Sequence, residues 1–93
     1  MRVIKILPSF ERTLKKASDK DRKKLKKSLH QLNNFIESGI LLKGLGLKKL
    51  RGSIYELRVD IRLRVILQID EEAVYLVLIG SHNDIKRYLG RYK

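Results

Sequence analysis

Two arginines, Arg58 and Arg64, are the residues of this 93-residue sequence best suited to chemistry on a phosphate. A charged guanidinium holds its N–H donors in a planar fork that matches phosphate oxygens. Arg58 lies within residues 54–59 and Arg64 within residues 61–69, and both runs alternate between apolar and polar side chains. Such alternation is typical of β-strands with one buried face. The pairing of these two strands therefore decides whether the arginines can act together.

Strand parity places the two arginines on one face of the predicted sheet. Successive side chains of a strand point to opposite faces, and the odd positions of both runs hold the larger apolar set. The two apolar sets share a face only when paired positions sum to an even number. Pairing Val59 with Leu63 meets this condition and leaves a three-residue loop, residues 60–62. In this register Arg58 lies directly across from Arg64.

An arginine pair of this kind needs a compensating anion. Like charges directly opposite each other on adjacent strands repel, so the pair is unfavourable when left alone. Glu56 and Asp60 share the face of Arg58 and are candidates to supply the negative charge. A bound phosphate would serve the same purpose. The alternative is that the arginines form the solvated side of a half-exposed sheet.

Residues 73–79 form a further run that is apolar on both faces. This pattern is typical of a central strand that is covered on both sides. Something must therefore pack over the polar face near its middle, either the C-terminal tail or a partner chain. After Gly80, the polar turn from Ser81 to Asp84 lies at the strand end, where side chains are free to reach a ligand.

The composition indicates a polyanionic partner. Lys and Arg number 22 against 10 Asp and Glu, which gives a formal net charge of +12 and a pI near 10.2. Such a charge repels itself in a folded protein and is usually carried because nucleic acid is bound. Without cysteine, disulfides, thiolate zinc sites and cysteine nucleophiles are excluded, and two isolated histidines, His30 and His82, make no metal site. We expect one cytoplasmic domain, residues 1–93, with no cofactor and no membrane span.

The elements that must position these residues follow from hydrophobic periodicity. The spacing predicts a helix from Pro8 to about Ala17 and a second helix capped by Ser18 and ending at Ser38 and Gly39. Strands are predicted at residues 1–7, 54–59, 61–69 and 73–79, a basic connector with glycines at 40–52, and a short helix within 81–93. The predicted class is α+β, in the order β-α-α-β-β-β, with two N-terminal helices on one face of a small antiparallel sheet.

Four stretches of the chain follow one another in a characteristic order. They are Phe10 with the charged first helix, Lys48-Lys49-Leu50-Arg51-Gly52, Tyr55-Glu56-Leu57-Arg58-Val59 followed by Arg64-Val65, and Ile79-Gly80-Ser81-His82-Asn83-Asp84. This combination resembles the RelE/ParE superfamily of bacterial and archaeal toxins, and it is most similar to the RelE-type messenger RNA endonucleases.

The resemblance implies a RelE-like fold and a toxin of a type II toxin–antitoxin system. A cognate antitoxin protein would hold such a toxin inactive. The free toxin would bind the ribosome, cleave messenger RNA in the A site and so inhibit translation. The cut would be a metal-independent transesterification, in which a ribose 2′-hydroxyl attacks the adjacent phosphate. It requires a base, an acid for the leaving 5′-oxygen, and cations around the phosphorane.

The resemblance also assigns catalytic roles to four residues. Arg58 and Arg64 match positions that bind the scissile phosphate. His82 matches a glycine-x-histidine position used as general acid or base, and an unperturbed histidine suits proton transfer near neutral pH. Tyr88 matches an aromatic residue that stacks on a base or helps to activate the hydroxyl. The residues expected to bind RNA are Lys23, Lys27, Lys48, Lys49, Arg51, Arg62, Lys86 and Arg87.

Glu56 departs from the family pattern, because some members carry a lysine at this position. An acid beside a phosphate clamp is unfavourable unless it acts as a base or pairs with Arg58. Two other functions stay open: a ParE-like inhibitor of DNA gyrase, against which His82 argues, and a non-catalytic RNA-binding or partner-binding module. Under the favoured hypothesis, the basic residues outside the arginine pair dock on ribosomal RNA or hold an acidic antitoxin segment.

Overall fold

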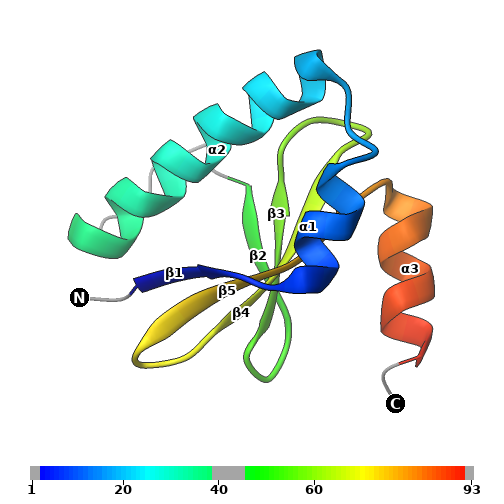
Figure 1. The fold of residues 1–93 in the computed structure, drawn as a ribbon. Helices are drawn as coiled ribbons and strands as arrows, with labels where there is room; N and C mark the ends of the chain where they lie inside the picture. The colour runs from blue at the N-terminus through cyan, green and yellow to red at the C-terminus, as the bar shows by residue number, and fades with distance from the viewer. Residues whose placement is uncertain (1–2, 39–45, 92–93) are drawn as a thin grey trace.

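The computed structural model describes residues 3–38 and 46–91, which form three helices and one five-stranded sheet. In chain order the elements are β1 (Val3–Ile6), α1 (Pro8–Leu14), α2 (Asp19–Ser38), β2 (Leu47–Arg51), β3 (Ile54–Arg58), β4 (Arg64–Ile69), β5 (Ala73–Gly80) and α3 (His82–Arg91). The strand order is β1-β5-β4-β3-β2, in which β1 runs parallel to β5 and the other neighbours are antiparallel (Figure 1). The predicted α+β class is confirmed.

Helix α1 is fastened to the central strand β5. Pro8 is its first residue, where a fixed φ and a missing N–H do no harm. Two hydroxyls then join the helix to the strand: Ser9 Oγ donates to the carbonyl oxygen of Val77 at 2.6 Å. The N–H of Ile79 donates to Thr13 Oγ1 at 3.1 Å. The position of α1 therefore depends on β5, which lies more than 60 residues away in the chain.

Helix α2 lies across one face of the sheet with its apolar stripe inward. Ser18 is the predicted N-cap, and its Oγ accepts a hydrogen bond from the N–H of Asp21 at 3.1 Å. Leu25 and Leu32 are buried against the sheet, whereas the lysines and arginines of the first turns face outward. The described part of the helix runs to Ser38.

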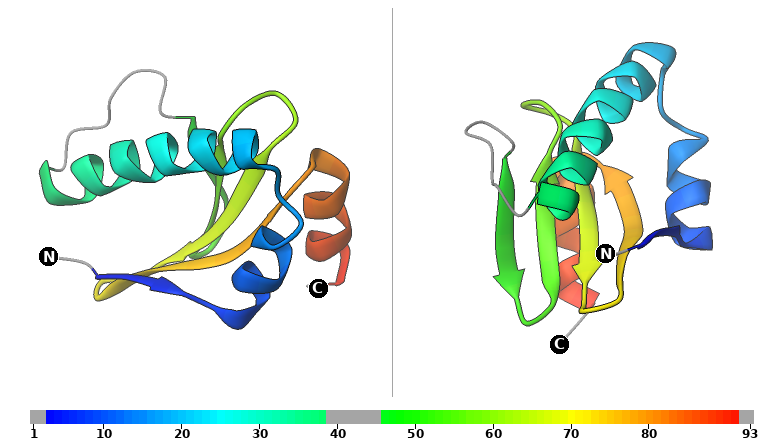
Figure 2. Two further views of the ribbon diagram at one scale, coloured as in Figure 1. Left: turned by 45° about the horizontal axis from the view of Figure 1, so that its top comes forward. Right: turned by 90° about the vertical axis from the view of Figure 1, so that its left-hand side faces the viewer.

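Two apolar layers cover opposite faces of the sheet. The larger layer joins Phe10 and the buried leucines of α2 to the odd-numbered residues of β3 and β4. The smaller layer consists of Ile66, Val77 and Ile85, and α3 supplies the last of these. Figure 2 shows α2 and α3 on opposite sides of the strands. The sequence left the cover of the second face open between the C-terminal tail and a partner chain; in the structure α3, which belongs to the C-terminal tail, packs there.

The predicted connector contains a strand. Residues 47–51 form β2, which pairs with β3 at the edge of the sheet and is interrupted by a bulge between Lys49 and Arg51. Leu47 and Leu50 pack against the larger and the smaller layer. The charges and glycines of this stretch are typical of a loop, which is why no strand was predicted here. Lysines on an edge strand also discourage unwanted pairing with another sheet. Residues 39–45, including the predicted stop at Gly39, lie outside the described residues.

Two further boundaries differ from the predictions. Helix α1 ends at Leu14, and the N–H of Ala17 donates to the Leu14 carbonyl in a turn that follows it. Strand β4 begins at Arg64 and not at residue 61, because Asp60 holds the preceding residues in a tight loop. Among the described residues, no helix is both long enough and apolar enough to cross a membrane.

Candidate functional site

The structure pairs Arg58 directly with Arg64. The N–H of Val59 donates to the carbonyl oxygen of Leu63 at 2.9 Å, which closes the loop in the predicted register. The odd-numbered residues of both strands are buried in the larger layer, so any one-residue slip would expose them. The hydrophobic pattern of β3 and β4 therefore places the two arginines side by side on the opposite face.

A glycine flanks the arginine pair on each side. Across β2, the carbonyl oxygen of Gly46 accepts a hydrogen bond from the N–H of Arg58 at 3.1 Å. Across β5, Gly80 is the partner of Arg64. A Cβ on Gly80 would lie 2.8 Å from Asp84 Oδ2, so glycine is required for the close approach of the first turn of α3. The row of four residues thus brings the start of α3 next to Arg64.

Glu56 supplies the anion that the arginine pair requires. Its Oε1 lies 2.5 Å from Nη1 of Arg64, and the two side chains are 11% and 20% exposed. Asp60, the other candidate, instead pairs with Lys24. Arg58 is exposed and takes part in none of the ion pairs found among the described residues. Glu56 therefore pairs with Arg64, and the guanidinium of Arg58 is the one left open to solvent.

His82 and Tyr88 both lie on α3, beside the sheet face that carries the arginines. His82 is the first residue of the helix and is exposed, two positions after the partner of Arg64. Tyr88 is half-buried and packs against the smaller layer. The four residues predicted to be catalytic thus come from β3, β4 and α3 and lie toward one end of the sheet.

Asp84 fixes the first turn of α3. Its Oδ2 accepts hydrogen bonds from the N–H and the Oγ of Ser81, at 2.9 and 3.0 Å, and its Oδ1 accepts one from Arg87 at 2.8 Å. The hydrogen bonds from Ser81, more than the charge of Arg87, hold the pKa of the Asp84 carboxyl below its usual range. This network sets the direction in which the helix leaves β5 and therefore where its side chains lie.

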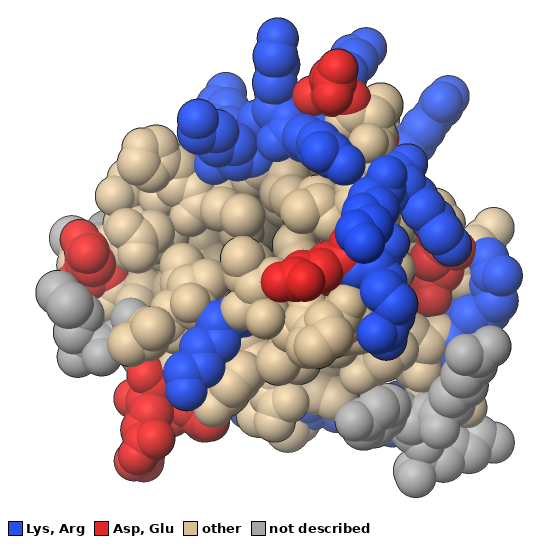
Figure 3. Space-filling view, viewed as in Figure 1, with Lys and Arg blue, Asp and Glu red and all other residues tan. Residues whose placement is uncertain are grey.

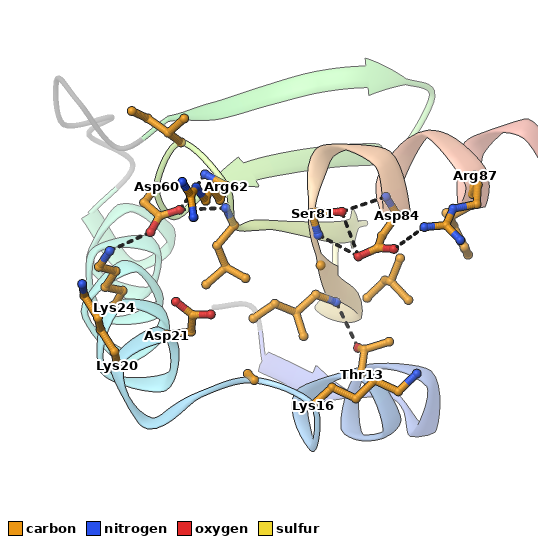
Figure 4. Close-up of a pocket in the computed structure, with 17 residues that line it drawn as sticks. Thr13, Lys16, Lys20, Asp21, Lys24, Asp60, Arg62, Ser81, Asp84 and Arg87 are labelled. Atoms are coloured by element: carbon orange, nitrogen blue, oxygen red, sulfur yellow. Dashed lines mark hydrogen bonds and ion pairs between the residues drawn. The ribbon is translucent and has the colours of Figure 1, made fainter.

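A cleft of about 1040 Å³ adjoins this end of the sheet, between α1, the start of α2, the β3–β4 loop and α3 (Figure 4). We call it the basic cleft. Its charged lining comprises Lys16, Lys20, Lys24, Arg62 and Arg87 with Asp21, Asp60 and Asp84, and Tyr88 and Leu63 are among its other walls. Arg62, Arg87 and Tyr88 are predicted site residues; Lys16, in the turn after α1, and Lys20 at the start of α2 are not. The order of elements along the chain gives no sign that α2 would meet the β3–β4 loop.

Asp60 builds the wall of the basic cleft between α2 and the β3–β4 loop. Its Oδ1 accepts hydrogen bonds from the N–H groups of Arg62 and Leu63 at 2.8 and 2.7 Å, and its Oδ2 lies 2.7 Å from Lys24 Nζ. The hydrogen bond from Lys24, then that from the Arg62 backbone, lowers the pKa of Asp60 from 3.8 to about 2. Ile61 is 76% exposed at the tip of this tightly held loop.

The remaining residues predicted to bind RNA are all exposed, and they fall on separate elements. Lys23 and Lys27 lie on α2, Lys48, Lys49 and Arg51 on β2, and Lys86 on α3. Figure 3 shows lysines and arginines gathered over the first turns of α2 and continuing down beside the basic cleft. Within residues 3–38 and 46–91, no group of three or more His, Cys, Asp or Glu side chains is placed to hold a metal ion.

The chain shares its fold with several solved toxin structures. It superposes on a mutant of YafQ from E. coli with a TM-score of 0.71 at 16% identity, covering 91% of this chain and 98% of that one. It superposes on RelE in the RelB–RelE antitoxin–toxin complex from Methanococcus jannaschii with a TM-score of 0.68 at 20% identity. That match covers 90% of this chain and 96% of the other. The superposition on the YoeB dimer from Staphylococcus aureus has a TM-score of 0.64 at 21% identity and covers 87% of this chain and 97% of the other. No protein-family model matches the sequence, and no curated protein matches it significantly.

Proposed function

We propose that this chain, which has the fold of RelE, YafQ and YoeB, is the toxin of a type II toxin–antitoxin pair and cleaves messenger RNA in the ribosomal A site. One observation carries the proposal: the cross-strand pair of Arg58 and Arg64 lies beside the start of α3, which bears His82. Two cations and an exposed imidazole at the end of one sheet are suited to phosphodiester cleavage.

The proposed reaction balances without an external reactant. The ribose 2′-oxygen loses its proton to a base and attacks the adjacent phosphorus. The bond from phosphorus to the 5′-oxygen then breaks, and an acid protonates the leaving oxygen. The products are a 2′,3′-cyclic phosphate and a free 5′-hydroxyl. Negative charge rises on the phosphoryl oxygens between these two steps, where positioned cations lower the barrier most.

Each residue has a role that suits its surroundings. The exposed guanidinium of Arg58 meets the phosphate of the incoming RNA, and Arg64 adds charge from the neighbouring strand. His82 transfers a proton, since it is exposed and is held next to the arginine pair by the turn at Gly80. Tyr88, which is half-buried at the basic cleft, orders a nucleotide beside the cut.

The partners follow from the charge distribution. The lysines of α2 and β2 are exposed and dock the protein on ribosomal RNA. A cognate antitoxin occupies part of the same basic surface, since an acidic segment would be attracted to it when the ribosome is absent. The antitoxin–toxin complexes solved for RelE and YafQ, which have this fold, support such a pairing.

The decisive experiment maps messenger RNA cleavage on translating ribosomes by primer extension. Wild type should cut within the A-site codon, and Arg64→Ala and His82→Ala should each be slower by roughly 10²- to 10³-fold. Arg12→Ala, which removes an exposed arginine from α1, is the matched control and should cut at the wild-type rate.

Other results would assign another function. If the wild type leaves messages intact but blocks DNA supercoiling by gyrase, the chain acts as ParE does. If it does neither and still binds RNA, it is a binding module, a function that the Glu56–Arg64 ion pair would favour because one arginine is already engaged. Growth arrest on expression, relieved by a co-expressed antitoxin, tests the pairing separately.

A further inference from the structure

Glu56 lies among the basic side chains on the face of the sheet that carries Arg58 and Arg64. On the arginine face of the sheet, Glu56 pairs with Ile66 while Arg58 pairs with Arg64, so Glu56 and Arg64 are diagonal neighbours. Diagonal positions on adjacent strands are within reach of long side chains. On its other side Glu56 is the partner of Lys48 on β2. A single acid is thus inserted among three cations on one face.

The ion pair with Arg64 is shielded from water. Glu56 is 8% exposed as a whole residue, and removal of a carboxylate from water is unfavourable unless a cation and hydrogen bonds compensate it. Nε of Arg64 is also buried and has no hydrogen-bond partner. Arg64 therefore cannot turn freely toward an incoming phosphate, because one nitrogen is bound to Glu56 and another lies inside the protein.

The charges of the face determine what a phosphate meets on arrival. Lys48, Arg58 and Arg64 contribute three positive charges and Glu56 one negative charge, which leaves a local sum of +2. Of the two arginines only Arg58 is exposed, so a phosphate that reaches the pair meets the guanidinium of Arg58 first. The charge of Arg64 gains importance when further negative charge develops on the phosphoryl oxygens.

We propose that Glu56 is a positioning residue of the cleavage site: it holds Arg64 in one orientation beside Arg58 and weakens the binding of the uncleaved RNA. This inference rests on the proposed ribonuclease function. An interaction that is weak in the bound substrate and strong in the transition state raises kcat, whereas equal binding of both lowers only KM. Glu56 thereby shifts the contribution of Arg64 from substrate binding to the chemical step.

The test compares Glu56→Gln with Glu71→Gln, which removes the same charge from an exposed position in the β4–β5 turn. The probe for binding is a single-stranded RNA oligonucleotide, titrated at several salt concentrations. Glu56→Gln should bind it roughly threefold to tenfold more tightly at low salt, because an anion near the phosphate is gone. The slope of the logarithm of its binding constant against the logarithm of salt concentration should steepen by about 0.7. The affinity of Glu71→Gln for the oligonucleotide should stay within about twofold of wild type.

Cleavage on ribosomes supplies the second readout. Glu56→Gln should lower KM while kcat falls by roughly 10- to 100-fold, since Arg64 loses its anchor. In an Arg64→Gln background, adding Glu56→Gln should change kcat by less than about twofold, because the acid acts through that arginine. A further drop in the double variant, or a rise in kcat for Glu56→Gln, would overturn the proposal.

A conservative variant keeps the test decisive if Glu56→Gln does not fold, which circular dichroism on heating will show. Glu56→Asp retains the charge but is shorter by one methylene group, so KM and the salt dependence should stay at wild-type values while kcat falls. A change in KM without a change in kcat would contradict the positioning role. If the wild type itself cuts no RNA, the proposed function fails, and the oligonucleotide titration alone still decides whether Glu56 weakens RNA binding.

Discussion

Asp60 is a single residue that joins the β3–β4 loop to α2. Its carboxylate receives two backbone N–H groups of its own loop and the ammonium group of Lys24 on α2. A carboxylate with such partners favours its charged form, which is why its pKa falls to about 2. The loop that leads from Arg58 to Arg64 therefore depends on the ionisation of one side chain.

The pH dependence of this contribution has a definite sign. The pKa of Asp60 is about 2 in the folded protein against 3.8 ordinarily, so its stabilisation is complete above about pH 4 and is lost as the pH falls toward 2. Asp60→Asn should lower the free energy of unfolding at pH 7 by about 1–2 kcal/mol, since 27% exposure of the side chain screens part of the effect. Urea titrations from pH 2 to pH 7 should show the two proteins converging at low pH. Glu71→Gln is the control, and a constant difference at every pH would contradict the interpretation.

Arg58 is the residue on which RNA binding should depend most directly. Because it is exposed and unpaired among the described residues, its substitution leaves no buried charge behind. Arg58→Gln should weaken the binding of a single-stranded RNA oligonucleotide by about tenfold at low salt. The slope of the logarithm of the binding constant against the logarithm of salt concentration should become shallower by about 0.7. Arg12→Gln should do neither, and equal losses in both variants would show that only net charge matters.

At the residue scale, sequence parity predicted the register of the arginines but not their partner. The buried set of Leu57 and Val65 leaves one register available, so the prediction that Arg58 faces Arg64 is confirmed. Pairing with Arg58, a neighbour on its own strand, was one of the alternatives open for Glu56, and the structure shows Glu56 paired with Arg64. Parity assigns a side chain to a face but does not say which neighbour on that face it reaches, because this depends on the local twist of the strands.

The junction between β5 and α3 is the element on which the site depends most. Asp84 lies against Gly80, so the helix starts close to the strand and immediately beside Arg64. Ile85 is 2% exposed and fixes the same turn to the smaller apolar layer. His82 and Tyr88 owe their positions to this arrangement.

Gly80→Ala should displace the first turn of α3. The new Cβ would lie 2.9 Å from Asp84 Cβ, which is too close for a carbon pair, so the helix must move. We expect a loss of about 1–3 kcal/mol, with a Tm lower by roughly 4–8 °C per kcal/mol, and slower cleavage. Gly90→Ala on the same helix meets nothing within 4 Å and should leave Tm unchanged or raise it slightly. If both variants behave alike, the close packing at residue 80 has no special importance.

At the element scale, the regular patterns were predictable and the interrupted ones were not. Hydrophobic alternation predicts strands β3 and β4, an uninterrupted apolar run predicts β5, and a side-chain oxygen before acidic residues predicts the N-cap at Ser18. Strand β2 was missed because glycines and lysines hide a short alternation at a sheet edge. The basic cleft was not predicted at all, since it forms where α2 meets a loop 36 residues further along the chain.

The charge of the whole molecule is unevenly distributed. On the face shown in Figure 3, lysines and arginines gather over the first turns of α2. A local concentration of one sign attracts a polyanion from a distance and orients it before contact. Strand β1 forms the sheet edge that lies away from the start of α2, so a lysine on β1 can serve as a control for the lysines of α2 (Figure 1).

Lys23→Gln combined with Lys27→Gln should weaken association with ribosomes without changing the reaction at the arginine pair. Both lysines are exposed on α2, so their removal should reduce the salt dependence of binding by about 0.7 to 0.9 for each phosphate that is no longer neutralised. Cleavage at saturating ribosome concentration should be within about twofold of wild type. Lys5→Gln on β1 is the control, and a loss of kcat in the α2 variant would place these lysines in the catalytic site instead.

The parallel pairing of β1 with β5 has a consequence for the order of events during synthesis. Val3 pairs with Ala73, so β1 cannot pair until a strand 70 residues further along the chain has been made. Helix α1 waits with it, because its two hydroxyl contacts are also with β5. Contacts so distant in sequence form late, after the entropy of a long loop has been overcome. We expect a chain interrupted before residue 73 to have neither the completed sheet nor α3, so that premature termination there yields an inactive product.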